Sequence, residues 1–191
     1  MRGDTLFASL IEESKKKELL TIARLINIFD LPLLWDGKSE KERNGECDLR
    51  RIAFNVSENH KINWSNFIKE YEKNSFLNSY MEDELLAEIG KLKLNSQNNV
   101  EKRFEIAEKI LKEEIIKDRH NNSKEMQQSR IILFEVMRSI FMISGLTDLK
   151  RRLLQIISIA YKIDGEDFNE LLAQATSLHK EMKRTINLVL E

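Results

Sequence analysis

Four carboxylates within seven residues are the side chains whose type and spacing point most directly to chemistry: Asp164, Glu166, Asp167 and Glu170. Carboxylate oxygens are preferred ligands of hard cations such as Ca²⁺, although such an ion takes about six to eight oxygens. The spacing differs from that of an EF-hand loop, which places ligands at alternate positions before a glycine. Carboxylates are also favoured at a helix N-terminus without any metal, because they cap backbone N–H groups and interact with the helix dipole. We therefore predict that this acidic turn caps a helix, and we keep a divalent-cation site as the alternative.

Three consecutive basic residues, Lys150, Arg151 and Arg152, follow the expected start of a helix. Positive charge at that end is unfavourable for the helix dipole. The basic cluster is therefore either a solvated face or a surface that binds a partner, and we name it as the candidate partner-binding site.

Motifs of catalysis and metal binding are absent from the sequence. The histidines His60, His120 and His179 lie in different segments, and none has a metal-ligand spacing to the single cysteine, Cys47. No phosphate loop or dinucleotide fingerprint is present, and no local motif joins a serine or cysteine nucleophile to a base. We predict a protein without enzymatic activity and without a cofactor. A helical enzyme whose site assembles from distant residues is a competing hypothesis.

Composition excludes several classes of protein. The chain has 191 residues and a net charge of -1, with 31 basic against 32 acidic residues, so there is no strong case for nucleic acid as a partner. No run of apolar residues is long enough for a membrane span, and the N-terminal residues lack the apolar region of a secretory signal. One cysteine cannot form an internal disulfide, which fits a cytoplasmic setting.

The acidic turn and the basic cluster belong to one stretch, Ser129–Leu172, around which we expect the fold to be organised. Its first half, Ile131–Ile143, is apolar at ten of thirteen positions, which indicates a buried central helix. Gly145 is suited to the left-handed residue that follows a helix, and Thr147 to the N-cap of the next one. A connection this short predicts an antiparallel helical hairpin.

The hairpin also supplies the expected core. Glu135 and Arg138 are three residues apart and can pair, and we predict an ion pair at the rim of the core. The side chains that we expect to be largely buried are Ile132, Phe134, Met137, Phe141, Leu154, Ile157 and Phe168.

The rest of the chain shows mainly helical periodicity. We predict one long helix over Asp4–Phe29, ended by Pro32, and a turn at Asp36-Gly37. Residues Ile52–Val56 alternate like a strand, but a lone strand is marginal, so we favour a short helix or an extended connector there. Further helices are expected from Asn63 or Ser65 to Tyr71, over 76–92, over 100–117 and from Asp167 to Val189.

The chain reads as a single domain, 1–191, with a weak pattern of two halves, 5–92 and 100–190. Glu18–Asp30 aligns without gaps on Arg152–Asp164, and four of the aligned positions are identical. Two amphipathic helices can match this well by chance, so the repeat is a hypothesis.

Residues Leu153–Leu172 resemble one half of a tellurite-resistance TerB-like domain. The family pattern is an apolar helix that ends in an alanine-rich turn, an Asp-Gly-acidic loop and a helix that opens with Glu. The residues at the matching places are Ala160, Asp164, Gly165, Glu166 and Glu170. The first half departs from it, because Asp30 is followed by Leu31-Pro32. The match covers about forty residues in all, Ile131–Leu172. The resemblance implies an all-helical fold and a metal-associated or protein-interaction module of prokaryotic stress-response and defence systems.

We therefore predict an all-α protein, a compact multi-helix bundle around a central helical hairpin. Its expected role is that of an interaction module or accessory subunit in a bacterial stress-response or defence system, with another protein or a larger complex as partner; a homo-oligomer is a further alternative. The competing function is divalent-cation binding by the acidic turn.

Overall fold

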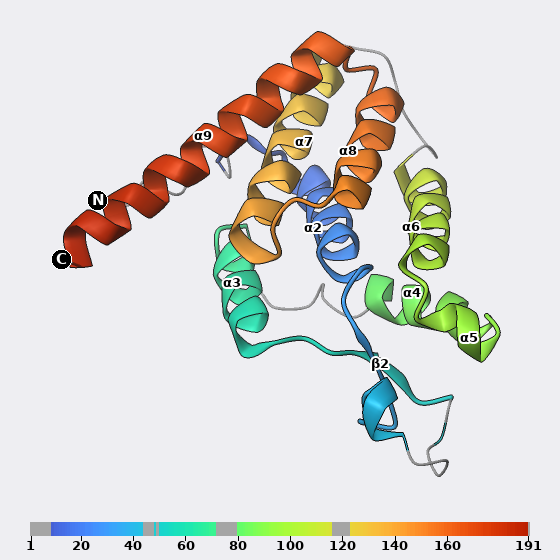
Figure 1. Ribbon diagram of the computed structural model, residues 1–191. Coiled ribbons are helices and arrows are strands. Elements are labelled where there is room, and N and C mark those ends of the chain that lie inside the picture. Colours follow the sequence, from blue (N-terminus) through green and yellow to red (C-terminus); the bar gives the residue numbers. More distant parts are fainter. Residues whose placement is uncertain (1–8, 44–47, 49, 72–79, 116–122, 191) are drawn as a thin grey trace.

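The computed structural model of the chain describes residues 9–43, 48, 50–71, 80–115 and 123–190 (Figure 1). Within these residues the protein is an all-α bundle with one small hairpin, which confirms the predicted fold class. The elements, in order, are α2 (Glu13–Ile28), β1 (Leu33–Trp35), the 3-10 helix η1 (Glu40–Glu42), β2 (Ile52–Phe54), α3 (Glu58–Lys69), α4 (Tyr80–Gly90), α5 (Leu94–Gln97), α6 (Val100–Ile115), α7 (Ser123–Ile143), α8 (Asp148–Ala160) and α9 (Gly165–Leu190).

The central element is α7, which packs against α2, α3, α8 and α9 (Figure 1). It is followed by the expected turn, in which Gly145 has a φ of 75° and donates its N–H to the carbonyl of Ile140. Thr147 then caps α8 by accepting the N–H of Lys150. The predicted hairpin of α7 and α8 is therefore present, and α8 also packs against α6 and α9.

Six of the seven predicted core residues are buried, and Phe141 is the exception. Phe141 is only half-buried, and its ring stacks on that of His179 with 5.7 Å between centroids. Phe141 lies near the end of α7, where the side chains from residue 141 to 144 are only partly buried. The apolar run Ile131–Ile143 did not indicate that burial decreases toward its end.

The predicted long N-terminal helix is interrupted, because Ile11 and Glu12 leave helical geometry before α2 begins at Glu13. Gln128 of α7 holds the break: its side-chain oxygen accepts the N–H of Glu12 at 3.0 Å, and its amide nitrogen donates to the carbonyl of Leu10 at 2.9 Å. A contact across more than a hundred residues therefore overrides the local periodicity. The part of the prediction before Ser9 lies outside the described residues.

A short antiparallel hairpin replaces the helix or connector that we favoured near residue 52. Strand β2 finds its partner in β1, where Leu33 is opposite Phe54, so the alternating pattern was the correct signal. Trp35 at the end of β1 is buried, and its ring N–H donates to the side-chain oxygen of Gln97 at 2.8 Å. Asp36 and Gly37 both have positive φ, as the predicted turn requires.

Two helices begin earlier than predicted. The N-cap of α3 is Ser57, which accepts the N–H of His60 at 3.3 Å, and neither Asn63 nor Ser65 is a cap. Helix α9 begins at Gly165 and not after Asp167. In each case the structure uses a cap upstream of the predicted start, Ser57 for α3 and Asp164 for α9.

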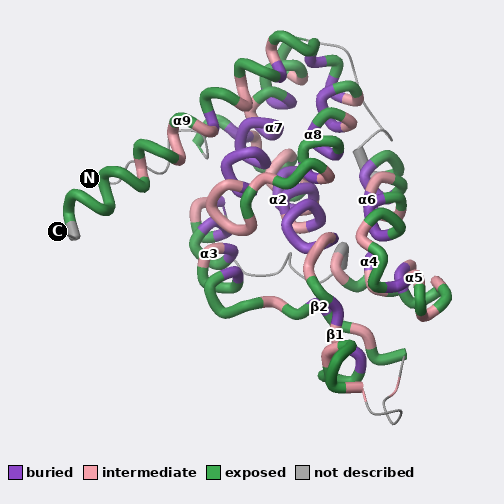
Figure 2. Tube along the Cα trace, in the orientation of Figure 1, coloured by how far each residue is buried: buried purple, intermediate pink, exposed green. Residues whose placement is uncertain are grey.

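The buried residues of both halves of the chain form one core, and Phe29, the C-cap of α2, meets Phe104 of α6 edge to face. Figure 2 shows burial concentrated along α2 and α7, whereas the C-terminal part of α9 leaves the bundle and is exposed throughout residues 183–189. Among the described helices, none has the length and apolar character needed to cross a membrane.

Candidate functional site

The acidic turn is built as a helix cap. Asp164 accepts the N–H of Asp167 at 2.8 Å through its side chain, and the carboxylate of Asp167 pairs with Arg130 of α7. Glu166 and Glu170 are exposed. Within the described part of the chain, no three His, Cys, Asp or Glu side chains gather closely enough to hold a metal ion.

The basic cluster does not form one surface. Lys150 is 2% exposed, and its Nζ lies 3.0 Å from Asp30 at the end of α2. Arg152 lies over the ring of Phe104 and pairs with Glu101, both on α6, while Arg151 is exposed. Successive residues of a helix point about 100° apart, so three in a row cannot share a face. The candidate partner-binding site is corrected accordingly, since Lys150 belongs to the interior.

Asp30 and Lys150 belong to a buried polar cluster that the sequence did not reveal. His60 of α3 is buried beside it, and its Nε2 has no hydrogen-bond partner in the structure. Burial and the charges of Arg24 and Lys150, opposed by that of Asp30, lower the pKa of His60 to about 4. The imidazole is therefore neutral near pH 7, and its enclosed Nε2 is out of reach of a substrate in solution.

A second buried network joins α3 to α7, and it corrects the predicted rim position of Glu135 and Arg138. Glu135 is fully buried and accepts hydrogen bonds from the hydroxyl of Tyr71 and, at 2.7 Å, from Nε of Arg138. Arg138 also pairs with Glu70. Burial and the charge of Glu135 raise the pKa of the Tyr71 hydroxyl. All four side chains are engaged with one another, which indicates that the network ties two helices together.

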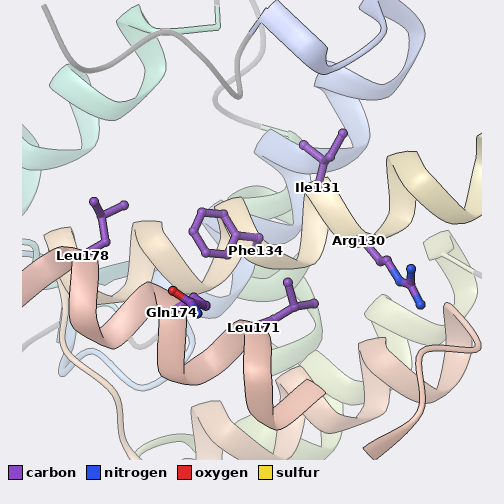
Figure 3. Close-up of a pocket in the computed structure, with 6 residues that line it drawn as sticks. All are labelled: Arg130, Ile131, Phe134, Leu171, Gln174 and Leu178. Carbon is purple, nitrogen blue, oxygen red and sulfur yellow. The ribbon is translucent and has the colours of Figure 1, made fainter. Parts of the chain in front are cut away.

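An apolar groove of about 420 Å³ lies between α7 and α9 (Figure 3). Its walls are Arg130, Ile131 and Phe134 of α7 and Leu171, Gln174 and Leu178 of α9. Arg130 stands at one end of the groove and pairs with Asp167 of α9. The volume is within the range of small-molecule and cofactor sites, about 300–1,000 Å³.

The groove continues into an apolar stripe on α9 whose C-terminal end nothing in the described structure covers. The stripe steps by three or four residues along the whole helix and consists of Phe168, Leu171, Ala175, Leu178, Met182, Ile186 and Val189. Its first residues pack on the bundle, and Phe168 and Ala175 are buried. Near its end, Ile186 and Val189 are 54% and 78% exposed.

The uncovered stretch also carries an excess of positive charge. Between residues 180 and 189, Lys180, Lys183 and Arg184 stand against one acidic residue, Glu181. On a helix of about 100° per residue, Lys183 and Glu181 border the stripe on opposite sides, while Lys180 and Arg184 lie on the far face. This part of α9 is therefore amphipathic with a basic polar face.

No protein-family model, curated protein or solved structure matches this chain. Geometry alone therefore defines the candidate site, which consists of the α7–α9 groove and the exposed stripe of α9. Sequence reasoning found the stripe as part of an amphipathic helix, but it missed the groove and the length over which the stripe is uncovered.

Proposed function

We propose that the protein is a helical interaction module that docks another protein along α9. The observation that carries this proposal is the continuous apolar stripe of α9, half of which is used in the core while Ile186 and Val189 are left in water. Placing two large aliphatic side chains in water forgoes about 1.5–3 kcal/mol for each, relative to burying it. A partner that covers them recovers this free energy.

The polar clusters support a binding role over an enzymatic one. His60 is a buried titratable group that could act as a base, but its Nε2 is enclosed. Tyr71, Glu135 and Arg138 are bound to one another. Neither cluster opens into the α7–α9 groove, whose lining is mainly apolar.

The resemblance of residues 153–172 to TerB-like domains supports a proposal about the cellular role of the module. We propose that the module is an accessory subunit of a bacterial stress-response or defence system and acts in the cytoplasm. Cation binding by the acidic turn is the second candidate and rests on Glu166 and Glu170, whose carboxylates are exposed and open to a ligand.

Site-specific photo-crosslinking in the cells that produce the protein tests the docking function. A photo-reactive amino acid at Ile186 should form an adduct with another protein, identified by mass spectrometry. The matched control is the same group at Asn187, which is also exposed but points away from the stripe. Equal adducts at both positions, or none at Ile186, would refute docking along α9.

A further inference from the structure

We propose that a groove between α8 and α9 binds a small organic molecule that carries a phosphate group. This α8–α9 groove has a volume of about 470 Å³; its α8 wall is Arg151, and its α9 wall runs from Asn169 to Lys180. It shares no lining residue with the α7–α9 groove. The proposal goes beyond the docking function, because it adds a ligand site on another face of the same helix.

Positive side chains gather along this groove. Arg151 and Lys180 line it from opposite helices. Lys183 and Arg184 lie three and four residues beyond Lys180, so they share its side of α9. All four side chains are exposed, and in the described part of the chain none of them forms an ion pair. The groove therefore carries positive charge that the protein itself leaves uncompensated.

The arrangement of these cations opposes helix stability. On α3, Lys61 pairs with Glu58 three residues away, at 2.7 Å. On α9, the residues three and four positions from Lys180 are cations instead, and like charges at this spacing destabilise a helix. Arg151 lies within about one turn of the N-terminus of α8, where the helix dipole opposes a positive charge. A bound anion would relieve both unfavourable interactions.

Carboxylates are placed away from the groove. Between Asn169 and Lys180, α9 has a single acidic residue, Glu170. At about 100° per residue, Glu170 points about 120° away from Thr176, which lines the α9 wall. Asp148 and Glu166, at the starts of the two helices, are exposed, and neither lines the groove. An anion in the groove therefore meets cations without a carboxylate between them.

The lining suits a phosphate attached to an organic body. Arginine binds phosphate through two parallel N–H bonds and lysine binds it as a compact charge. The amide of Asn169 and the hydroxyl of Ser177 can donate further hydrogen bonds to phosphate oxygens, while Leu172 and Ala173 offer apolar surface to the rest of the molecule. The volume is within the range of small-molecule sites, about 300–1,000 Å³.

Larger anionic partners fit this surface less well. Nucleic acid is attracted by positive charge spread over a whole face, but the net charge of this chain is -1. A helix that lies on a membrane directs its apolar side chains toward the lipid. Here the exposed side chains of Ile186 and Val189 lie about 120° or more around α9 from Lys180. A small anion needs only the local set of cations.

Isothermal titration calorimetry with the full chain tests the proposal. The probes are phenyl phosphate, which is largely dianionic near pH 7, benzoate, with one negative charge, and uncharged benzyl alcohol. Phenyl phosphate should bind about tenfold or more tightly than benzoate, and benzyl alcohol should not bind. The affinity for phenyl phosphate should fall as salt is raised. Inorganic phosphate should bind more weakly than phenyl phosphate, because it has no ring to contact Leu172 and Ala173.

A matched pair of double variants locates the site. Arg151→Gln with Lys180→Gln should weaken the binding of phenyl phosphate about tenfold or more. Both side chains are exposed, so this variant should fold like the parent protein. Lys17→Gln with Arg50→Gln is the control, because it removes the same charge from exposed positions that do not line the groove. Its affinity should change by less than about twofold.

Several results would overturn the proposal. Absence of phenyl phosphate binding at millimolar concentration would reject the site, and equal binding of benzoate would remove its preference for phosphate. Equal losses in the two double variants would assign the binding to overall charge. Tighter binding of a uridine oligonucleotide or of phosphatidylglycerol vesicles, lost in Arg151→Gln with Lys180→Gln, would assign the face to nucleic acid or to a membrane. Photo-crosslinking at Ile186 tests docking along the stripe separately.

Discussion

At the scale of single residues, His60 makes stability depend on pH. In the unfolded chain it takes up a proton near its ordinary pKa of 6.5, whereas in the folded protein its pKa is about 4. Between these values the unfolded state binds more protons, so the free energy of unfolding falls as pH is lowered. The positive charges of Arg24 and Lys150 favour the neutral form, and the carboxylate of Asp30 only partly opposes them.

We expect His60 to remove about 2–3 kcal/mol of stability between pH 6.5 and pH 4. Urea unfolding of the parent and of His60→Gln at several pH values in this window measures the effect. All other titratable groups are present in both proteins, so we assign the difference between the two curves to the histidine. Parallel curves would mean that His60 is protonated in the folded state as readily as in the unfolded chain.

Arg138 provides the second test at this scale. It is the positive charge that compensates Glu70 and the fully buried Glu135. Arg138→Met should cost about 3–5 kcal/mol, because it leaves a buried carboxylate without its cation. Adding Glu135→Gln removes the orphaned charge and should recover part of the loss, as chemical denaturation can show. A loss below about 1 kcal/mol in the single variant would indicate that water reaches Glu135.

At the scale of elements, the acidic turn separates capping from metal binding. Because Asp164 caps α9, Asp164→Ala should cost about 0.5–2 kcal/mol with or without divalent metal. Glu166 makes no capping contact, so the melting temperature of Glu166→Gln should be close to that of the parent protein. Melting curves in chelator, Ca²⁺, Mg²⁺ and Zn²⁺ test this. A rise in melting temperature at micromolar metal that Glu166→Gln abolishes would favour the cation site, by mass action.

The stripe of α9 should divide into a structural part and a free part. Phe168 is buried, so Phe168→Ala should cost about 3–5 kcal/mol. Ile186→Ser with Val189→Ser should change stability by no more than about 0.5 kcal/mol, because these side chains are already in water. Thermal or urea unfolding of the two variants is sufficient. A large loss in the second variant would show that the end of α9 packs on its own chain.

At the scale of the whole molecule, one core joins elements from both ends of the sequence. Trp35 lies in the small hairpin and Trp64 in α3, so they report on separate regions of that core. We expect tryptophan fluorescence and far-ultraviolet circular dichroism to give coincident unfolding curves. In Trp35→Phe the tryptophan fluorescence comes from Trp64 alone. The unfolding midpoints measured by fluorescence and by circular dichroism should still agree in this variant. Two separated transitions would instead support two independently folding halves.

Local patterning was sufficient for several elements. The helix over Val100–Ile115 follows directly from its apolar spacing, and the turn at Gly145 with the cap at Thr147 follows from backbone preferences of single residues. These features depend on interactions within a few residues, which the order of amino acids specifies directly. The all-helical architecture therefore follows from local conformational preferences along the chain.

The tertiary structure alone decided which side chains meet. Gln128 accepts the N–H of Glu12 at a point where the sequence pattern predicts a continuous helix. Lys150 belongs to a basic run in the sequence, but it pairs with Asp30 in the interior. β1 turns a marginal alternation near Ile52 into a paired strand.

The candidate site also depends on tertiary packing. Periodicity marks the apolar stripe of α9 from Phe168 to Val189, but whether a stripe is core or docking surface depends on how far a neighbouring helix extends beside it. Here α7 ends at Ile143, and the stripe continues beyond it. Sequence order determines local geometry because its interactions are short in range, whereas cover and exposure depend on packing between segments far apart in the chain.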